Sequence, residues 1–346
     1  MAMYREKSRR YGALMLAVSV CLRLCMALGL DAKAAAFLTN AAKTREFARW
    51  MLFLETGQTV TAPEEAPDRL FVLEMEPAPT PTAEPEPAPP AADAPQEALT
   101  LIPADRLSVA GACTHSFDKQ ALLARPTQMD FSGPGPHILI VHTHGSEAYT
   151  PTAGYRTLNT DQSVVQVGAV LAKTLTDAGF SVIHDQSIND HPSFNNAYWT
   201  TLQKIEKWKA QYPNLQMVID IHRDAAEDEA GNAVALSAQA NGESCARLML
   251  VVGTDQGGLS HPNWQENLAN ALKLQSVLEG AYPGLCRSMD LRTERFNQHA
   301  APGSILVEVG THGNTLSQAM ASAELLGEGI ARMIRTMEEN GGKLEE

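Results

Sequence analysis

Short runs of apolar, β-branched residues alternate with longer amphipathic stretches from residue 138 onward. The short runs predict buried strands within residues 138–149, 180–184, 217–225, 248–253 and 304–310. The longer stretches carry apolar residues at helical spacing and predict helices at residues 161–179, 199–212, 264–278 and 316–337. This alternation predicts an α/β fold, an open and mostly parallel sheet with helices on both faces.

Three of the predicted strands end in residues that bind metals or move protons. The residues at these ends are His142, His144 and Glu147 in ILIVHTHGSEAY, Asp220 and His222 in MVIDIHRDA, and Glu308 in SILVEVG. In an open α/β sheet the carboxyl ends of the strands meet at one crevice, where such folds bind ligands. Imidazoles and carboxylates from three strand ends therefore predict a hydrolytic zinc site.

Zinc chemistry gives each of these residues a role. A catalytic zinc takes three nitrogen or oxygen ligands from the protein, commonly two His and one Glu, and leaves a fourth position for water. His144, Glu147 and His222 supply that set, and Glu308 is the expected general base. His142 is an alternative ligand, because a period of two places it on the same side of a strand as His144. The His-x-x-Glu spacing to Glu147 favours His144.

Further polar residues near the predicted strand ends are candidates for contacts with substrate or with the metal ligands. Each also has a purely structural interpretation, as a polar strand end or a turn residue. The candidates are His142, His184, Arg223, Asp224, Asn297 and His312.

Six motifs follow one another along the second half of the chain. They are HTHGSEAY, VIHDQSINDHPSFNNAY, VIDIHRDA, VVGTDQGG, HPNWQENLANALKLQ and RFNQHAAPGSILVEVGTHGNTLSQA. Read in this order, they resemble the stage II sporulation protein P family of peptidoglycan hydrolases. The resemblance covers roughly residues 110–335.

The resemblance implies a zinc-dependent N-acetylmuramoyl-L-alanine amidase that thins septal cell wall during engulfment in endospore formers. Some members look able to cut peptide cross-links or stems as well. It implies His144, Glu147 and His222 as metal positions and Glu308 as the catalytic carboxylate. It also implies peptidoglycan as substrate, and stage II sporulation proteins D and M as partners in engulfment. The chain departs from the family at Phe296, where a Tyr is expected.

Two other functions use the same residues. A zinc carboxypeptidase or endopeptidase acting on wall peptides would carry the same His, Glu and His pattern, and only the bond that it cuts separates it from an amidase. A cell-wall-binding ectodomain without catalysis is the alternative outside the enzymes. Loss of Glu308 or of a ligand would mark that alternative, and these residues are intact.

Net charge and cysteine spacing bear on two questions, whether the chain binds nucleic acid and whether its cysteines bind a metal. The net charge is −13, and no basic stripe appears, so nucleic acid is a poor candidate for a partner. Cys113, Cys245 and Cys286 follow the predicted anchor without metal-type spacing, so they indicate no metal site, and no disulfide is assigned among them.

The first part of the chain predicts an exported, tethered enzyme. Residues 1–10 form a basic cytoplasmic tail, and residues 11–30 an apolar membrane anchor about 20 residues long. Residues 31–60 form a juxtamembrane helical segment, and residues 61–105 a Pro/Ala/Glu-rich disordered linker. The catalytic amidase domain then occupies residues 106–346, outside the cytoplasm.

Two alternatives remain for this N-terminal part. The apolar stretch follows a basic start and precedes Ala34 and Ala36, a pattern that also fits a cleaved signal peptide. Arg23 lies inside the expected span, where a charge costs about 2.5–3.5 kcal/mol on insertion scales. The juxtamembrane segment, with Phe47, Trp50 and Leu54 at helical spacing, also fits a docking helix for a membrane partner.

Overall fold

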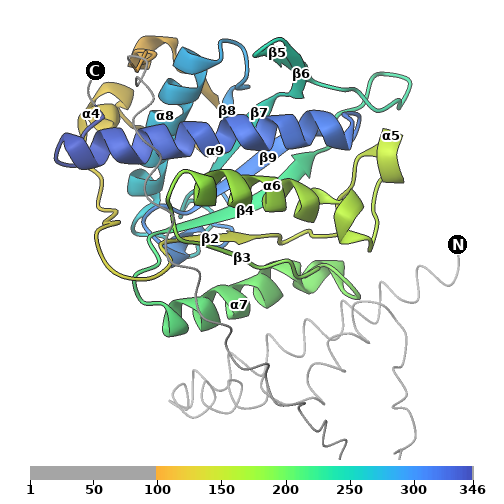
Figure 1. Cartoon of the computed structure of the whole chain (residues 1–346), viewed down its shortest axis with the longest axis horizontal. Coiled ribbons are helices and arrows are strands. Elements are labelled where there is room, and N and C mark those ends of the chain that lie inside the picture. Colours follow the sequence, from red (N-terminus) through yellow and green to blue (C-terminus); the bar gives the residue numbers. More distant parts are fainter. Residues whose placement is uncertain (1–98, 345–346) are drawn as a thin grey trace, which may run out of the picture. The chain divides into compact units, whose positions relative to one another are not determined.

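A seven-stranded sheet forms the centre of the computed structural model, which describes residues 99–344 (Figure 1). Its strand order is β1–β8–β7–β9–β4–β2–β3. The strands are β1 Val109–Ala110, β2 Ile138–Val141, β3 Val182–His184, β4 Met217–Asp224, β7 Leu248–Gly253, β8 Met289–Arg292 and β9 Ile305–Thr311. A separate antiparallel hairpin joins β5 Ser237–Ala240 to β6 Glu243–Ala246.

The sheet consists of two parallel blocks that run in opposite directions. Strands β3, β2, β4 and β9 are parallel to one another, as are β7, β8 and β1. The two blocks meet at β7 and β9, the one antiparallel pair in the sheet that the structure describes. The predicted mostly parallel α/β sheet is confirmed, and the first block brings the carboxyl ends of β2, β4 and β9 to the same edge.

Helices cover both faces of the sheet. Ile138 and Ile140 of β2 belong to the large apolar core that includes α6 Val164–Asp177, α8 Trp264–Ala281 and α9 Leu316–Glu339. The intervening Leu139 and Val141 belong to a smaller core with Ile205 of α7 Ala197–Gln211. Figure 1 shows α6 and α9 side by side on one face, with α7 on the other. A strand buried on both faces explains why the run ILIV has no polar position.

The ends of the long helices follow local capping chemistry. The Ser163 hydroxyl accepts from Val165 N at the start of α6, and Thr315 forms a capping box with Gln318 at the start of α9. The remaining short helices are η1 Ala104–Arg106, α4 Lys119–Ala124, α5 Thr150–Ala153, η2 Thr160–Gln162, η3 Phe194–Asn196 and η4 Gln298–Ala300.

Residues ahead of η1 take part in the core. Leu99, Leu101 and Ile102 pack against it, and Ser276 Oγ of α8 donates to Ile102 O at 2.7 Å. The predicted anchor, juxtamembrane segment and most of the predicted linker lie outside the residues that the structure describes. Within residues 99–344, the helices lack the combination of length and apolar character that a bilayer-crossing segment needs.

Candidate metal-dependent active site

The expected ligands and the expected base come together at the carboxyl ends of β2, β4 and β9. These strands are adjacent and parallel, so the turn after β2 lies beside the end of β4. His222 of β4 and Glu308 of β9 are partners in register, directly opposite each other. Neighbouring parallel strands therefore place Glu308 next to the candidate ligands.

Glu147 and His222 are expected ligands whose side chains contact each other. Glu147 Oε2 lies 3.4 Å from His222 Nδ1 and accepts from Arg223 N at 3.2 Å. Burial alone would raise the pKa of Glu147, but His222 and Arg223 lower it below its ordinary value. Burial would likewise lower the pKa of His222, but Asp220 and Glu147 raise it well above its ordinary value. The carboxylate is thus held ionised, as a metal ligand must be.

His144 lies across from His222. The two ring centres are 5.3 Å apart and the rings are nearly perpendicular. Phe194 stacks on the His144 ring at 4.4 Å, and Tyr198 meets its edge at 5.5 Å. The buried His144 Nδ1 has no hydrogen-bond partner, and burial lowers the pKa of the ring. The neutral form of the imidazole is the one that binds metal.

The donor set fits zinc in type and in part of its geometry. Bonds of about 2.0–2.1 Å to a tetrahedral ion separate two ligand atoms by roughly 3.3 Å, and two bound imidazole centres by about 5 Å. The contacts of His222 with Glu147 and with His144 match those spacings. Within residues 99–344, however, no group of three His, Cys, Asp or Glu residues is already arranged to hold an ion. The zinc site therefore remains a proposal.

Glu308 has the surroundings expected of a proton carrier. The side chain is half-buried, and its buried Oε2 has no hydrogen-bond partner. Burial raises its pKa to about 8, because removal from water disfavours the charged form. A carboxyl group whose pKa lies near neutrality can both take and return a proton.

His142 and His184 contact each other instead of the candidate ligands. Their Nε2 atoms are 2.8 Å apart, so one ring donates and the other accepts. Burial lowers the pKa of His142 to about 3 and that of His184 to about 4. Gly168 of α6 leaves room for this pair, since a Cβ there would meet His142 Cε1 at 2.5 Å. Strand β2 ends at Val141, so the period of two no longer applies to His142 and His144.

The side chains of Arg223 and Asp224 bind to segments next to the end of β4. Arg223 Nε donates to Ala148 O at 3.0 Å, and its Nη2 to Tyr155 O at 2.7 Å. Asp224 Oδ2 pairs with Arg287 Nη1 at 2.7 Å. Both side chains already have strong partners, and Arg223 also contacts the expected ligand Glu147, through its backbone N–H at 3.2 Å and its Nη1 at 3.9 Å.

Asn297 and His312 lie on either side of the site. Asn297 Nδ2 donates to Tyr198 O at 2.8 Å and so ties the segment before β9 to α7. His312 is buried, its ring lies 5.2 Å from Tyr155, and its Nδ1 has no partner. His312 therefore keeps a free nitrogen near the crevice, whereas the Asn297 amide is engaged by the backbone.

Three residues at the site were given no role from the sequence, although Asp220 was noted there at a strand end. Asp190 and Asp220 are buried carboxylates beside His144 and His222, at 3.9 Å from Nδ1 and 3.1 Å from Nε2, although neither contact is an aligned hydrogen bond. The Tyr198 ring packs on Phe296 at 5.7 Å, and burial raises the pKa of its phenol well above the ordinary value. Asp220 was visible as a strand-end carboxylate, and Asp190 only as part of a polar loop after a strand.

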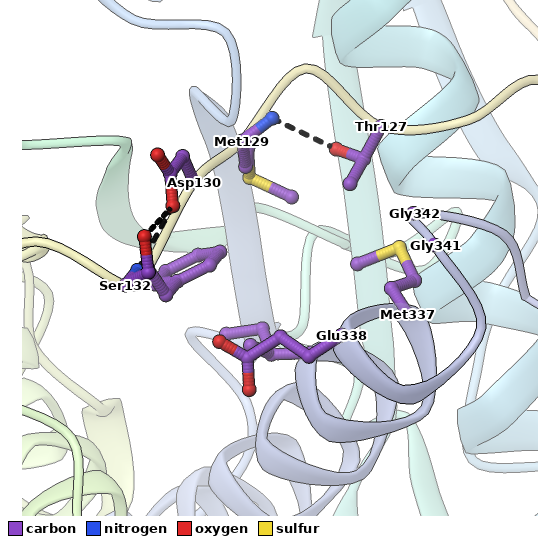
Figure 2. Close-up of a pocket in the computed structure, with 10 residues that line it drawn as sticks. Thr127, Met129, Asp130, Ser132, Met337, Glu338, Gly341 and Gly342 are labelled. Carbon is purple, nitrogen blue, oxygen red and sulfur yellow. Dashed lines mark hydrogen bonds between the residues drawn. The ribbon is translucent and has the colours of Figure 1, made fainter.

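A pocket of about 430 Å³ lies away from these residues, between residues 127–132 and the C-terminal end of α9 (Figure 2). Helix α9 starts beside the carboxyl end of β9 and runs back, so its last turn reaches the opposite edge of the sheet. Of the acidic side chains around this pocket, Asp130 is already bonded to Ser132. The chemistry is therefore assigned to the strand ends and not to this pocket.

Two amidases are among the solved structures to which this chain is similar. The N-acetylmuramoyl-L-alanine amidase AmiC2 of Nostoc punctiforme is 15% identical with a TM-score of 0.36, covering 60% of this chain and 99% of that one. The CwlD amidase from Clostridioides difficile, solved in complex with the GerS lipoprotein, is 14% identical with a TM-score of 0.32, covering 59% and 99%.

Comparison of the sequence with known proteins identifies a family. Stage II sporulation protein P of Bacillus subtilis (strain 168) is 24% identical over 212 residues, which make up 57% of this chain and 50% of that protein. The chain thus spans about half the length of the curated relative that it matches. The model of the family called stage II sporulation protein P matches residues 83–331. Because this match covers well over half of the sequence, the chain belongs to the stage II sporulation protein P family.

Proposed function

We propose that this chain is a zinc-dependent peptidoglycan hydrolase, an N-acetylmuramoyl-L-alanine amidase that acts on septal cell wall during sporulation engulfment. Family membership supports the biological setting and the substrate. The observation that carries the chemistry is the ligand-like spacing of Glu147 and His222, with Glu308 directly opposite His222 on the next strand.

Each residue has a defined task in this proposal. His144, Glu147 and His222 hold the zinc, which when bound supplies a Lewis acid that lowers the pKa of water towards neutrality. Glu308 takes a proton from the attacking water. It returns that proton to the amide nitrogen as the carbon–nitrogen bond between the lactyl carbonyl and the peptide breaks. The products are a muramic carboxylate and a peptide with a free amino terminus.

The proposal extends to the position of the enzyme. Residues 11–30 anchor the chain in the membrane as a single span, and residues 61–105 extend the catalytic domain outside the cytoplasm, where stage II sporulation proteins D and M are its partners. This part rests on the basic start, the apolar stretch and the proline-rich composition of the sequence.

Metal analysis tests the ligand set. The full-length protein should bind one zinc per chain, and His144→Ala and His222→Ala should each lose stoichiometric zinc while remaining folded. The deletion of an imidazole ligand leaves too few donors for a stable site. Retention of full zinc by both variants would reject these ligands. Asp161→Ala, at an exposed residue, is the control.

Mass analysis of digested peptidoglycan identifies the bond that is cut. An amidase releases stem peptides that begin with L-alanine and leaves glycan strands with unsubstituted lactyl groups. A carboxypeptidase or endopeptidase shortens or separates the peptides while they stay attached to the glycan. An unchanged wall after incubation with zinc-loaded protein would favour the binding ectodomain.

A further inference from the structure

The loop that joins β3 to α7, residues 185–196, docks on the turn that carries His144. Asn189 Nδ2 donates to His142 O at 2.9 Å. A Cβ on Gly145 would lie 3.0 Å from Ser187 O, so a side chain there would push the loop by a few tenths of an ångström. The loop and the turn are therefore closely packed, although they lie about 40 residues apart in the sequence.

Asp190 is the charged residue of this contact. Its buried carboxylate accepts from Ser146 N at 3.1 Å and Ser146 Oγ at 2.6 Å, and pairs with Arg156 Nη1 at 2.5 Å. The same Oδ2 oxygen lies 3.9 Å from the unpaired Nδ1 of His144. At this distance the two atoms do not form a hydrogen bond, but the negative charge of a buried carboxylate favours the proton on the ring nitrogen that faces it.

Phe194 holds the same imidazole from its face. Its ring stacks on His144 at 4.4 Å with an interplanar angle of 10°. The Arg156 guanidinium lies 4.7 Å from the centre of the Phe194 ring. Arg156 therefore contacts both residues that border His144, and one loop approaches the imidazole from its edge and from its face.

Asp220 provides the same arrangement for the other imidazole. It accepts from Thr143 N at 2.8 Å and Thr143 Oγ1 at 2.5 Å, and lies 3.1 Å from His222 Nε2. Two aspartates thus hold the residues on either side of His144 and Gly145, and each also faces one candidate ligand. The repetition within one site argues that Asp190 does more than fasten a loop.

We propose that Asp190 and Phe194 are positioning residues that fix the ring orientation and the tautomer of His144, with Arg156 holding both in place. This inference rests on the proposed zinc site. With the proton kept on Nδ1 next to Asp190, Nε2 is left as the metal donor. Loop 185–196 thereby determines how strongly the site binds zinc, without supplying a ligand.

Zinc affinity, measured on the full-length protein by competition with a chelator, tests the proposal. Asp190→Asn should weaken zinc binding by about 10–100-fold, the usual effect of removing a carboxylate behind a ligand. Phe194→Ala should weaken it less, because the His144 ring loses its stacking partner but keeps the nearby Asp190 carboxylate. The matched controls are Asp177→Asn and Trp199→Ala, an exposed carboxylate and an exposed aromatic with zinc affinity expected to be unchanged.

Arg156 supplies a second variant at a partly exposed position, which avoids dependence on the folding of Asp190→Asn. Arg156→Gln should also weaken zinc binding, although Arg156 additionally lies 3.9 Å from Glu147 Oε1. Its effect combined with Asp190→Asn should be less than additive, because the two changes remove the same Arg156–Asp190 ion pair. Nitrogen NMR of the zinc-loaded protein should show a protonated His144 Nδ1, with an altered signal in Asp190→Asn.

The outcomes separate this inference from the proposed function. Wild-type zinc affinity in Asp190→Asn, Phe194→Ala and Arg156→Gln would overturn the positioning role while leaving the zinc site intact. Undiminished zinc in His144→Ala would instead reject the ligand set on which the inference rests.

Discussion

Glu147 illustrates how one carboxylate is kept charged inside the protein. It is buried, yet Arg156 and Arg223 guanidinium nitrogens each lie 3.9 Å from Oε1, and Oε2 accepts a backbone N–H and faces His222. These partners offset the cost of removing a charge from water. Glu308, on β9, has no such partner for Oε2. The two carboxyl groups are therefore suited to different tasks, one as ligand and the other as proton carrier.

Replacement of Glu308 by Gln separates these tasks. The amide keeps the size of the side chain but cannot take a proton, so turnover should fall by at least about 100-fold. Zinc content and the unfolding transition should stay close to those of the wild type, because Glu308 holds no metal in the proposal. Steady-state kinetics and metal analysis of the same sample measure both quantities. Near-normal turnover would reject the role of Glu308.

The sequence predicted two of the ligand candidates and the expected base because each follows an apolar run that marks a strand end. His144, His222 and Glu308 could be found in this way. Asp190 and Phe194 could not, because their loop lacks periodicity and comes near His144 only through the packing of loop 185–196 on the turn. The pairing of His142 with His184 was equally hidden, since it depends on where β2 ends and on the space left by Gly168.

Among the elements, long periodic segments were predicted closely and short ones were missed. Residues 264–278 were expected as a helix, and α8 spans Trp264–Ala281. The four-residue strand β8 and the hairpin of β5 and β6 went unnoticed, because runs so short carry little periodic signal. The reversed direction of β7 relative to β9 was not predicted either, since an apolar run does not encode the direction of its neighbours.

Helix α8 contains a buried cation that should make stability depend on pH. Lys273 is fully buried, donates to Arg125 O at 2.7 Å, and has its pKa lowered to about 8 by burial. Between pH 8 and the unfolded-state value near 10.4, the unfolded chain binds the additional proton, so the free energy of unfolding rises with pH over this window. The stabilisation is present at high pH and is lost as the pH falls through 8.

Comparison with Lys273→Met isolates this contribution. From pH 7.5 to pH 10, the free energy of unfolding of the wild type should rise relative to the variant by roughly 2 kcal/mol, measured by urea denaturation of metal-free protein. Lys173→Met, at an exposed position on α6, should show no such trend. A difference between wild type and Lys273→Met that is independent of pH would contradict the lowered pKa.

At the scale of the whole molecule, the folded unit begins before the predicted domain boundary at residue 106. Leu101 and Ile102 bury apolar surface against the core, and Ile102 exchanges hydrogen bonds with Ser276 of α8. A chain that starts at residue 106 should therefore unfold more easily than one that starts at residue 99, by on the order of 2 kcal/mol. Denaturation of the two proteins, with the full-length chain as reference, measures this difference. Equal stability would show that residues 99–105 add nothing.

The two outer strands of the sheet are its shortest. β1 contributes two residues and β3 three, so each edge of the sheet exposes only a few unpaired backbone N–H and C=O groups. Long, flat edge strands can pair with strands of other chains, and such pairing starts aggregation. With edges this short, many copies of this protein can be crowded together without their sheets joining edge to edge.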